Sequence, residues 1–215
     1  IGPIKVDKIA PNCPSIKANV AEKTWTNNTI ELTITPTNDT KSWTWYTNVN
    51  GGEYTQFSTV TGTKKVTFSA EGERQGKIVL MDDAGNSRTC YTGLYYVDKT
   101  VPNCPTVSVV RNEKGYPVVL RIKPTSDTVR WTWYTNDLKG GWNKWNTYTS
   151  SQEDLSLEAE GVRQGRVVVI DRANNEKTCN TSSYTIDYCD STDLQYGEWS
   201  SCKNGKQTRE VKTIA

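Results

Sequence analysis

The sequence predicts an all-β protein made of two tandem sandwiches of short strands, and three observations support this prediction. The first is an internal repeat of about 90 residues, in which Val6–Pro14 returns as Val97–Pro105 and Trp43–Asn48 returns as Trp131–Asn136. The second is an alternation of apolar and polar residues with a period of two, as expected for half-buried strands. The third is an abundance of Thr and of Asn-Gly, Gly-Gly and Pro-containing turns, which disfavours helices.

The expected strands follow one another in the same order in both copies. Ile30, Leu32 and Ile34 alternate with polar residues, which indicates a strand with one buried face. The continuous apolar runs 78–81 and 167–170 are suited to a central strand. The segments expected as strands are 30–34, 43–48, 66–68 and 78–81, repeated as 118–122, 131–136, 155–157 and 167–170. About seven strands in about 90 residues are typical of the immunoglobulin-like sandwich.

The spacing between equivalent segments changes slightly along the chain. It falls from 91 residues at the first cysteine of each copy to 88 at the paired tryptophans, and then rises to 89 at Glu71–Gly76 and its repeat. We therefore expect a small deletion within 106–117 and a one-residue insertion near Asp137–Lys139, both in turns. The predicted parts are a preceding module or linker (1–9), two domains (10–99 and 100–187) and a partial third module (188–215) of a longer chain.

Composition excludes several functions. Lys and Arg number 26 against 24 Asp and Glu, and this near balance argues against a nucleic-acid binder, which needs a concentrated basic face. No apolar run reaches the roughly 20 residues that span a bilayer. The chain has no His, which removes the usual general base and the commonest zinc ligand. No P-loop, nucleotide fingerprint or nucleophile motif appears either, so we expect a non-catalytic protein.

The six cysteines fall two to each unit. Because the first and last strands of such a sandwich commonly run parallel along one edge, Cys13 and Cys90, which are expected to open these strands, start at the same pole. The predicted disulfides are Cys13–Cys90, Cys104–Cys179 and Cys189–Cys202. The rival interpretation, a metal site, lacks a Cys-x-x-Cys spacing and any His. The predicted fold class is therefore all-β, with tandem immunoglobulin-like β-sandwiches and one disulfide per repeat.

Two sequence patterns resemble bacterial immunoglobulin-like repeat domains. These domains carry D-x-A-G-N, then a last strand and a V-D-x-T-x-P junction, and the matching residues are Asp82–Asn86 and Tyr96–Pro102. The second copy keeps a looser form, Asp171–Asn175, with Asn174 in place of Gly and without the Pro junction. The resemblance spans roughly 10–187, and it implies tandem modules of bacterial surface proteins, adhesins or phage structural proteins.

Some large adhesins of this class hold calcium at domain junctions through aspartates, as hard cations prefer oxygen ligands. The matching positions are Asp82 or Asp83 with Asp98, and Asp171 with Asp187. Lys99 and Arg172 stand among these positions and oppose a cation. The alternative is that Asp82 and Asn86 make turn hydrogen bonds, and this alternative is favoured.

The tryptophans divide into two groups. Trp43 and Trp45, with Trp131 and Trp133, share one strand face and are expected to pack in the cores. The hairpin that follows carries Trp142, Trp145 and Tyr148 in the second copy, and Tyr54 in the first. Such aromatics can stack on a sugar or contact a protein partner, although the alternation lets some of them face the core.

The segment Tyr196–Arg209 resembles the opening of a thrombospondin type 1 repeat, because Trp199-Ser200-Ser201-Cys202 precedes Gln207-Thr208-Arg209. That resemblance implies an Arg stacked on a Trp ring. The second Trp and second Cys of such a repeat are missing, so a plain hairpin of the third unit is an equal alternative.

Together these observations predict a stalk or spacer of a bacterial cell-surface or secreted protein, whose partners are neighbouring modules of the same chain. The alternative is an adhesin module that binds a host glycan or protein through the second-copy aromatics. Calcium is the one cofactor considered, and we expect neither nucleic-acid binding nor membrane insertion.

Overall fold

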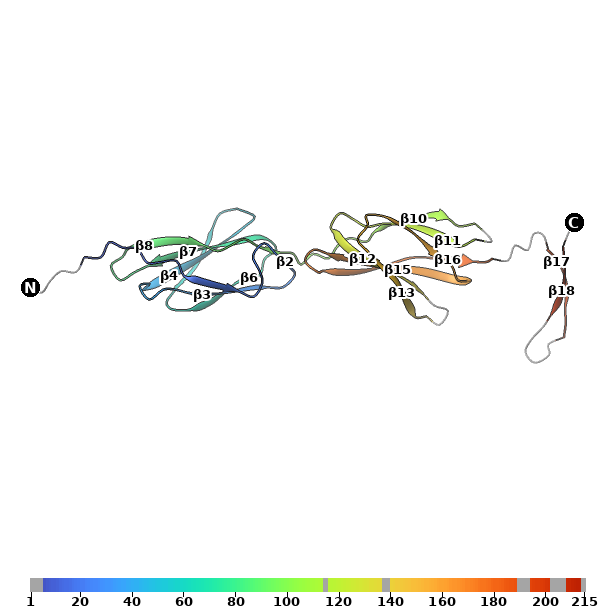
Figure 1. Cartoon of the computed structure of the whole chain (residues 1–215), viewed down its shortest axis with the longest axis horizontal. Helices are drawn as coiled ribbons and strands as arrows, with labels where there is room; N and C mark the ends of the chain where they lie inside the picture. The colour runs from blue at the N-terminus through green and yellow to red at the C-terminus, as the bar shows by residue number, and fades with distance from the viewer. Residues whose placement is uncertain (1–5, 114–115, 137–139, 189–193, 202–207, 214–215) are drawn as a thin grey trace, which may run out of the picture. The chain divides into compact units, whose positions relative to one another are not determined.

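The structure is a computed structural model that describes residues 6–113, 116–136, 140–188, 194–201 and 208–213. The described residues contain strands and turns and no helix. The chain divides into two compact units, Ile1–Val101 with Arg172–Asn175, and Pro102–Asp171 with Glu176–Ala215. Each unit contains a β-sandwich (Figure 1), so the predicted fold class is confirmed.

Unit 1 packs a three-stranded sheet against a six-stranded one. The first sheet has the order β1-β3-β6, from β1 (Ser15–Ala18), β3 (Ile30–Thr35) and β6 (Lys64–Phe68). The second has the order β2-β9-β7-β4-β5, with β8 also paired to β7, from β2 (Trp25–Thr26), β4 (Ser42–Val49), β5 (Thr55–Val60), β7 (Gly72–Met81), β8 (Ser87–Tyr91) and β9 (Tyr95–Val97). β2 and β9 run parallel, whereas the other neighbouring strands of this unit run antiparallel.

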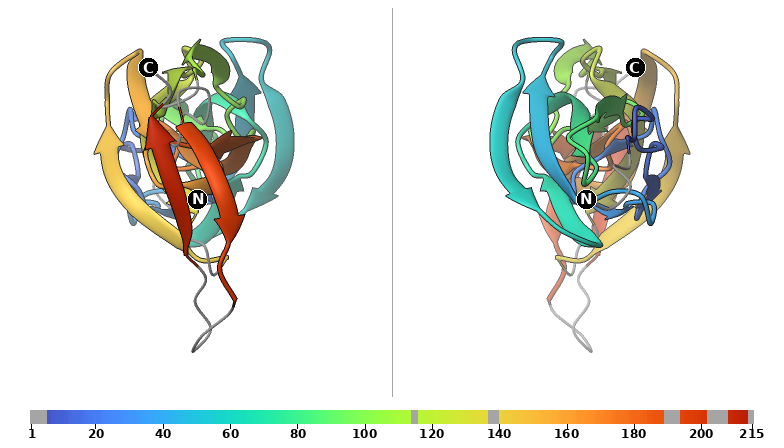
Figure 2. Two further views of the ribbon diagram at one scale, coloured as in Figure 1. Left: turned by 90° about the vertical axis from the view of Figure 1, so that its right-hand side faces the viewer. Right: turned by 90° about the vertical axis from the view of Figure 1, so that its left-hand side faces the viewer.

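Unit 2 repeats this plan with fewer strands. One sheet has the order β10-β11-β14, from β10 (Thr106–Arg111), β11 (Val118–Lys123) and β14 (Glu153–Leu157). The other has the order β13-β12-β15-β16, from β12 (Thr128–Asn136), β13 (Trp142–Tyr148), β15 (Gly161–Asp171) and β16 (Glu176–Ile186). A separate antiparallel hairpin follows (Figure 2, red), formed by β17 (Leu194–Trp199) and β18 (Arg209–Thr213).

The two units differ at one sheet edge. In unit 1 the short strand β2 pairs with β9, whereas the described part of unit 2 has no strand between β10 and β11. The predicted deletion within 106–117 lies in this connection. β8 and β9 of unit 1 correspond to the single continuous strand β16, because both pair with β7 as β16 pairs with β15.

The alternating residues form the cores as predicted. Ile30, Leu32 and Ile34 are fully buried on β3, and the corresponding residues Val118, Leu120 and Ile122 are buried on β11. The four tryptophans Trp43, Trp45, Trp131 and Trp133 are at most 4% exposed, which confirms that they belong to the cores. Each unit therefore has a hydrophobic core of its own.

The predicted insertion near Asp137–Lys139 is misplaced, although those residues lie outside the described part of the chain. Tyr46 pairs with Gln56, and Tyr134 pairs with Lys144, so the spacing is still 88 residues beyond the hairpin turn. The Trp43 indole N–H donates to the Gly62 carbonyl (2.9 Å), and Trp131 donates to Ser150 (3.0 Å), again 88 residues apart. The extra residue therefore lies after Ser150, in the connection from β13 to β14. By this register Trp142, Trp145 and Tyr148 correspond to Tyr54, Phe57 and Val60.

Two of the three predicted disulfides are present. Cys13 is joined to Cys90, and Cys104 to Cys179, with Cα atoms 5.9 and 5.8 Å apart. The third predicted pair, Cys189–Cys202, lies outside the described residues. The strand positions differ from the prediction, because Cys13 precedes β1 and Cys90 is near the end of β8 rather than at its start. The parallel edge pairing is also made by β2 rather than by β1.

Candidate functional site

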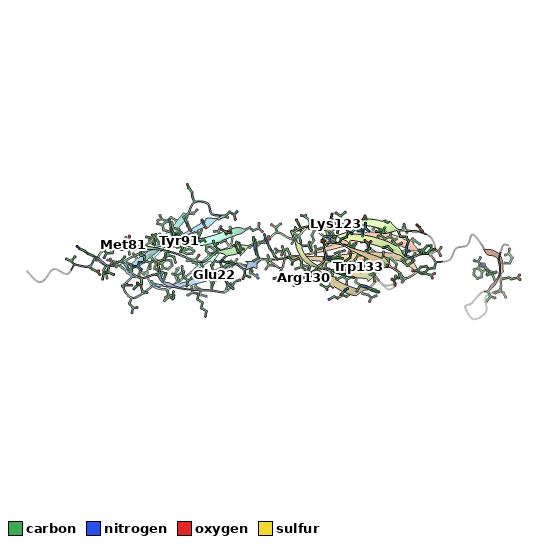
Figure 3. The ribbon with its side chains drawn as sticks, turned by 45° about the horizontal axis from the view of Figure 1, so that its top comes forward. Glu22, Met81, Tyr91, Lys123, Arg130 and Trp133 are labelled. Atoms are coloured by element: carbon green, nitrogen blue, oxygen red, sulfur yellow. A yellow bond between two sulfur atoms is a disulfide. The ribbon has the colours of Figure 1, made fainter. Side chains whose placement is uncertain are left out.

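The repeated motif Glu-Gly-x-Arg-Gln-Gly serves the packing of the core. A Cβ atom on Gly76 would lie 1.9 Å from the Trp45 ring, and one on Gly165 would lie 1.8 Å from the Trp133 ring, labelled in Figure 3. The Gly165 N–H donates to the Thr181 hydroxyl (2.9 Å), and Gly76 makes the same bond to Thr92. Glycine is therefore required here because a tryptophan ring lies directly on the backbone.

The arginine of this motif is buried in both units. Arg163 donates to three backbone carbonyls, those of Ala159 (2.8 Å), Glu160 (2.8 Å) and Asn136 (3.2 Å). Its guanidinium thereby ties the end of β12 to the connection between β14 and β15.

Arg74, the equivalent residue in unit 1, has a different environment. Its Nη2 donates to the Thr47 hydroxyl (3.3 Å), while its Nε and Nη1 have no hydrogen-bond partner. Its guanidinium lies 5.5 Å from the centre of the Phe68 ring, where unit 2 has the smaller Leu157. Burial lowers the pKa of Arg74. We attribute the difference between the two arginines to the bulk of Phe68.

The three second-copy aromatics proposed for binding have different surroundings. The Tyr148 ring stacks on the Trp131 ring with centroids 4.5 Å apart, so the half-buried Tyr148 packs against the core. The Arg166 guanidinium lies 3.8 Å from the centre of the Trp142 ring. Trp145, by contrast, is 66% exposed. Of these three residues, Trp145 presents the most accessible ring for a ligand.

Tyr54, the remaining predicted aromatic, belongs to a tyrosine cluster around the Lys77 ammonium. Lys77 Nζ lies 4.3 Å from the centroid of the Tyr46 ring and 4.8 Å from that of Tyr54. The Tyr91 ring (labelled in Figure 3) is centred 6.0 Å from the Tyr54 ring. The Tyr54 hydroxyl donates to Gln75 Oε1 (2.7 Å), and burial raises the pKa of Tyr54.

Both units therefore place a cation of the central strand against an aromatic ring, Lys77 in unit 1 and Arg166 in unit 2. Our sequence reasoning missed this arrangement, although a cation follows the Gln-Gly dipeptide of the motif in each copy. Such contacts contribute about 0.5–1 kcal/mol each at exposed sites. Their first effect is to hold Tyr54 and Trp142 against the central strands β7 and β15.

A cavity of about 210 Å³ opens beside Trp145 in unit 2. Thr135 and Asn136 at the end of β12 line it, together with Ser156 of β14 and Glu158, which directly follows β14. Leu157 and Arg163, which are both buried, lie at its base. The cavity thus combines one exposed aromatic face with hydroxyl, amide and carboxylate groups.

The turn chemistry predicted for Asp82 is present. The backbone N–H and the side-chain Nδ2 of Asn86 each donate to a carboxylate oxygen of Asp82, both at 2.8 Å. These bonds lower the pKa of Asp82, with the Asn86 side chain as the largest cause. Asn86 Nδ2 also lies 3.2 Å from the Asp7 carbonyl, so the turn contacts the entering chain. Asp83 forms an exposed ion pair with Lys41 (3.1 Å).

The aspartates predicted to share calcium are not brought together within a unit. Asp82 follows the end of β7, whereas Asp98 follows β9, whose last residue pairs with the first residue of β7. A strand of ten residues places the two roughly 30 Å apart. Asp171 and Asp187 are separated along β15 in the same way. In the described ranges no three acidic or Cys side chains are grouped to hold a metal.

A repeated turn that the sequence reasoning missed holds the residue before each first cysteine. Asp39 Oδ2 accepts a hydrogen bond from the Asn12 N–H (3.3 Å), and the Thr37 hydroxyl donates to the other oxygen. These bonds lower the pKa of Asp39, with the Thr37 hydroxyl as the largest cause. Asp127 accepts from the Asn103 N–H in unit 2 (3.4 Å). The recurring Pro-Thr-x-Asp sequence was the available signal.

In the tail, the Arg209 guanidinium lies 4.5 Å from the centre of the Trp199 ring, and the two residues pair across β17 and β18. This is the stacking that the thrombospondin resemblance implies, while the resemblance itself stays a prediction. Among the described residues, no helix has the length and apolar character needed to cross a membrane.

No protein-family model and no curated protein matches the chain. Similar solved structures include the fibronectin(III)-like modules of Clostridium thermocellum CbhA, at 18% identity and a TM-score of 0.38, covering 80% of this chain and 94% of that one. A 1.5-MDa bacterial ice-binding adhesin matches at 16% identity and a TM-score of 0.46, and the match covers 82% of this chain and 66% of that one. A Ca2+-stabilised adhesin of an ice-binding Antarctic bacterium matches at 17% identity and a TM-score of 0.47, and the match covers 82% of this chain and 49% of that one. At these TM-scores the likeness says nothing about ligand or activity.

Proposed function

We propose that the chain is a non-catalytic pair of spacer modules in the stalk of a bacterial cell-surface or secreted protein. The observation that carries this proposal is that each unit has its own core and its own disulfide. Disulfides persist in oxidising, extracellular environments, which supports a surface or secreted location. The bacterial source is supported by the D-x-A-G-N and V-D-x-T-x-P resemblance, and its neighbouring partners would be further modules of the same chain.

The disulfides suit a chain that is pulled from its ends. In unit 1, force that enters at Cys13 passes through the bond to Cys90, so the chain between them carries no load. β9 lies C-terminal to Cys90, outside this loop, so the pulling force can detach it from the sheet. In unit 2 the bond from Cys104 to Cys179 protects its loop in the same way. Single-molecule stretching with and without reductant tests this role directly.

The carboxylates whose pKa values are lowered accept structural hydrogen bonds, which supports the non-catalytic part of the proposal. Asp39 and Asp82 accept hydrogen bonds within turns. The Asp154 carboxylate accepts two hydrogen bonds from Arg121, each of 2.8 Å, which lower the pKa of Asp154. With no His in the chain, none of these groups is paired with an imidazole base.

A second candidate function is adhesion through unit 2, and one observation favours it. Trp145 is two-thirds exposed beside a cavity, whereas Trp142 and Tyr148 are held by Arg166 and Trp131. Exposed tryptophans at the edge of a hollow are frequent binding determinants. We propose a host glycan or protein as the ligand class of this site, in addition to the spacer role. Calcium binding at Asp82, Asp83, Asp98, Asp171 and Asp187 stays a prediction.

A further inference from the structure

At the positions that line the cavity beside Trp145, unit 1 has different residues at four places, and one of these changes is the conservative pair Ser156 and Thr67. By strand register Trp145 corresponds to Phe57, Leu157 to Phe68, and Glu158 to Ser69. The smaller Leu157 leaves room at the base, where Phe68 lies against Arg74 in unit 1. The larger indole and the added carboxylate then line the space so created. Unit 1 therefore supplies a matched control within the same chain.

The charge of the cavity is set by Glu158. Arg163 lies at the base, but its guanidinium donates to three backbone carbonyls and is engaged there. The Tyr188 hydroxyl donates to the Glu158 carbonyl and thereby fixes the backbone that carries the carboxylate. A site with an acidic rim and an engaged cation does not favour an anionic ligand such as a phosphate or an acidic sugar.

The geometry points to the unit 2 cavity as a site for one neutral hexopyranose ring at the end or branch of a glycan. This inference rests on the second function proposed above and narrows its ligand class. The apolar face of a pyranose would stack on the Trp145 ring. Its hydroxyls would meet polar groups of the lining residues Glu158, Asn136, Thr135 and Ser156. Asn136 would offer its Nδ2 donors, because its Oδ1 already accepts a hydrogen bond from the Gln164 N–H (2.7 Å).

The size of the cavity agrees with a single ring. Its volume of about 210 Å³ lies below the about 300–1,000 Å³ of pockets for drug-sized molecules. A cationic side chain of a protein partner is the competing occupant, since Trp145 and Glu158 attract cations as well. The sugar is favoured because one aromatic ring lines the cavity, the Arg163 guanidinium is engaged by backbone carbonyls, and Thr135, Asn136 and Ser156 are neutral.

The test titrates the oxidised 215-residue chain with neutral methyl hexopyranosides and follows the indole N–H signals by NMR. The Trp145 signal is assigned by its absence in Trp145→Ala. We expect it to shift with at least one glycoside. We also expect Trp145→Ala to weaken binding about ten-fold or more, and Glu158→Gln to weaken it measurably. Phe57→Ala in unit 1 should leave binding unchanged.

Tetramethylammonium and a lysine-rich peptide form the competing arm. Binding of these cations without any glycoside, lost in Trp145→Ala, would overturn the sugar assignment while leaving the adhesion function standing. Binding of neither class at Trp145 would overturn both. If Phe57→Ala weakened glycoside binding as much as Trp145→Ala does, the sugar would not bind specifically in the Trp145 cavity and the assignment would be overturned. Because Trp145 is mostly exposed, an unchanged unfolding midpoint of Trp145→Ala shows that the variant is folded.

Discussion

In each unit one core tryptophan, Trp45 or Trp133, packs directly on a glycine of the repeated Glu-Gly-x-Arg-Gln-Gly motif. Gly76 and Gly165 lie on the central strands β7 and β15 under Trp45 and Trp133, and a methyl group at either position would overlap an indole ring. The sequence predicted the burial of the tryptophans, because their spacing puts them on one strand face. It did not predict the role of the glycines, since that depends on which residue of the neighbouring strand lies opposite.

Gly165→Ala should therefore destabilise the protein by about 3 kcal/mol or more, since an overpacked core has no room to relax. The control is Gly140→Ala, where a Cβ meets nothing within 4 Å and the positive φ of 85° is the sole cost, about 1–2 kcal/mol. Urea unfolding of both variants measures the difference. Equal losses would contradict the packing account.

Asp82 gives a second test at this scale, through pH. The pKa of Asp82 is lowered in the folded state. Its contribution to the free energy of unfolding is therefore fully present above its ordinary pKa of 3.8 and is lost as the pH falls through the folded-state pKa. Near neutral pH, Asp82→Asn should therefore be less stable than the wild type. On acidification below about pH 4, the variant should lose less stability than the wild type does.

The matched control is Asp83→Asn, whose carboxylate is exposed and pairs with an exposed lysine, so its effect should stay within about 0.5 kcal/mol. Thermal unfolding across pH 2 to 7 makes the comparison. An identical pH profile for wild type and Asp82→Asn would show that the turn bonds contribute nothing.

Strand β13 shows how one element divides its aromatic residues among three roles. Tyr148 packs against the core, Trp142 packs on Arg166 and Trp145 faces solvent. The period of two predicted that some would face inward, but it did not say which. The register of β13 against β12 decides this, and it includes an irregularity between Trp133 and Tyr134. The insertion was also misplaced because strand register is not visible in the sequence. Aligning the Gly-Gly pairs 51–52 and 140–141 gives a spacing of 89 residues, whereas the paired strands keep a spacing of 88.

Alanine substitutions along β13 should therefore rank by environment. Tyr148→Ala should lose about 2 kcal/mol or more through its stacking on Trp131. Trp142→Ala should lose about 1 kcal/mol with its cation–π contact. Trp145→Ala should stay within about 0.5 kcal/mol. Chemical denaturation of the three variants checks the order, and a large loss at Trp145 would mean that its ring supports the fold.

At the scale of the whole molecule, the repeat carries most of what the sequence predicted: two sandwiches, their cores and a disulfide in each. The aspartates expected to share calcium lie at opposite ends of β7 and β15, which the spacing of the motifs along the chain could not reveal, and calcium binding stays a prediction. Loop closure by each disulfide would stabilise its unit by roughly 4 kcal/mol in the chain-entropy model. The bonds also determine how much of each unit can extend under load.

Stretching single molecules tests the spacer role most directly. With disulfides intact, each unit should unfold with a short increment, because the loops 13–90 and 104–179 stay closed. With reductant, each unit should lengthen further by roughly 250 Å, the extended length of the 77- and 75-residue separations. Full-length increments in oxidised protein, or increments unaffected by reductant, would contradict the account of two disulfide-protected spacer modules.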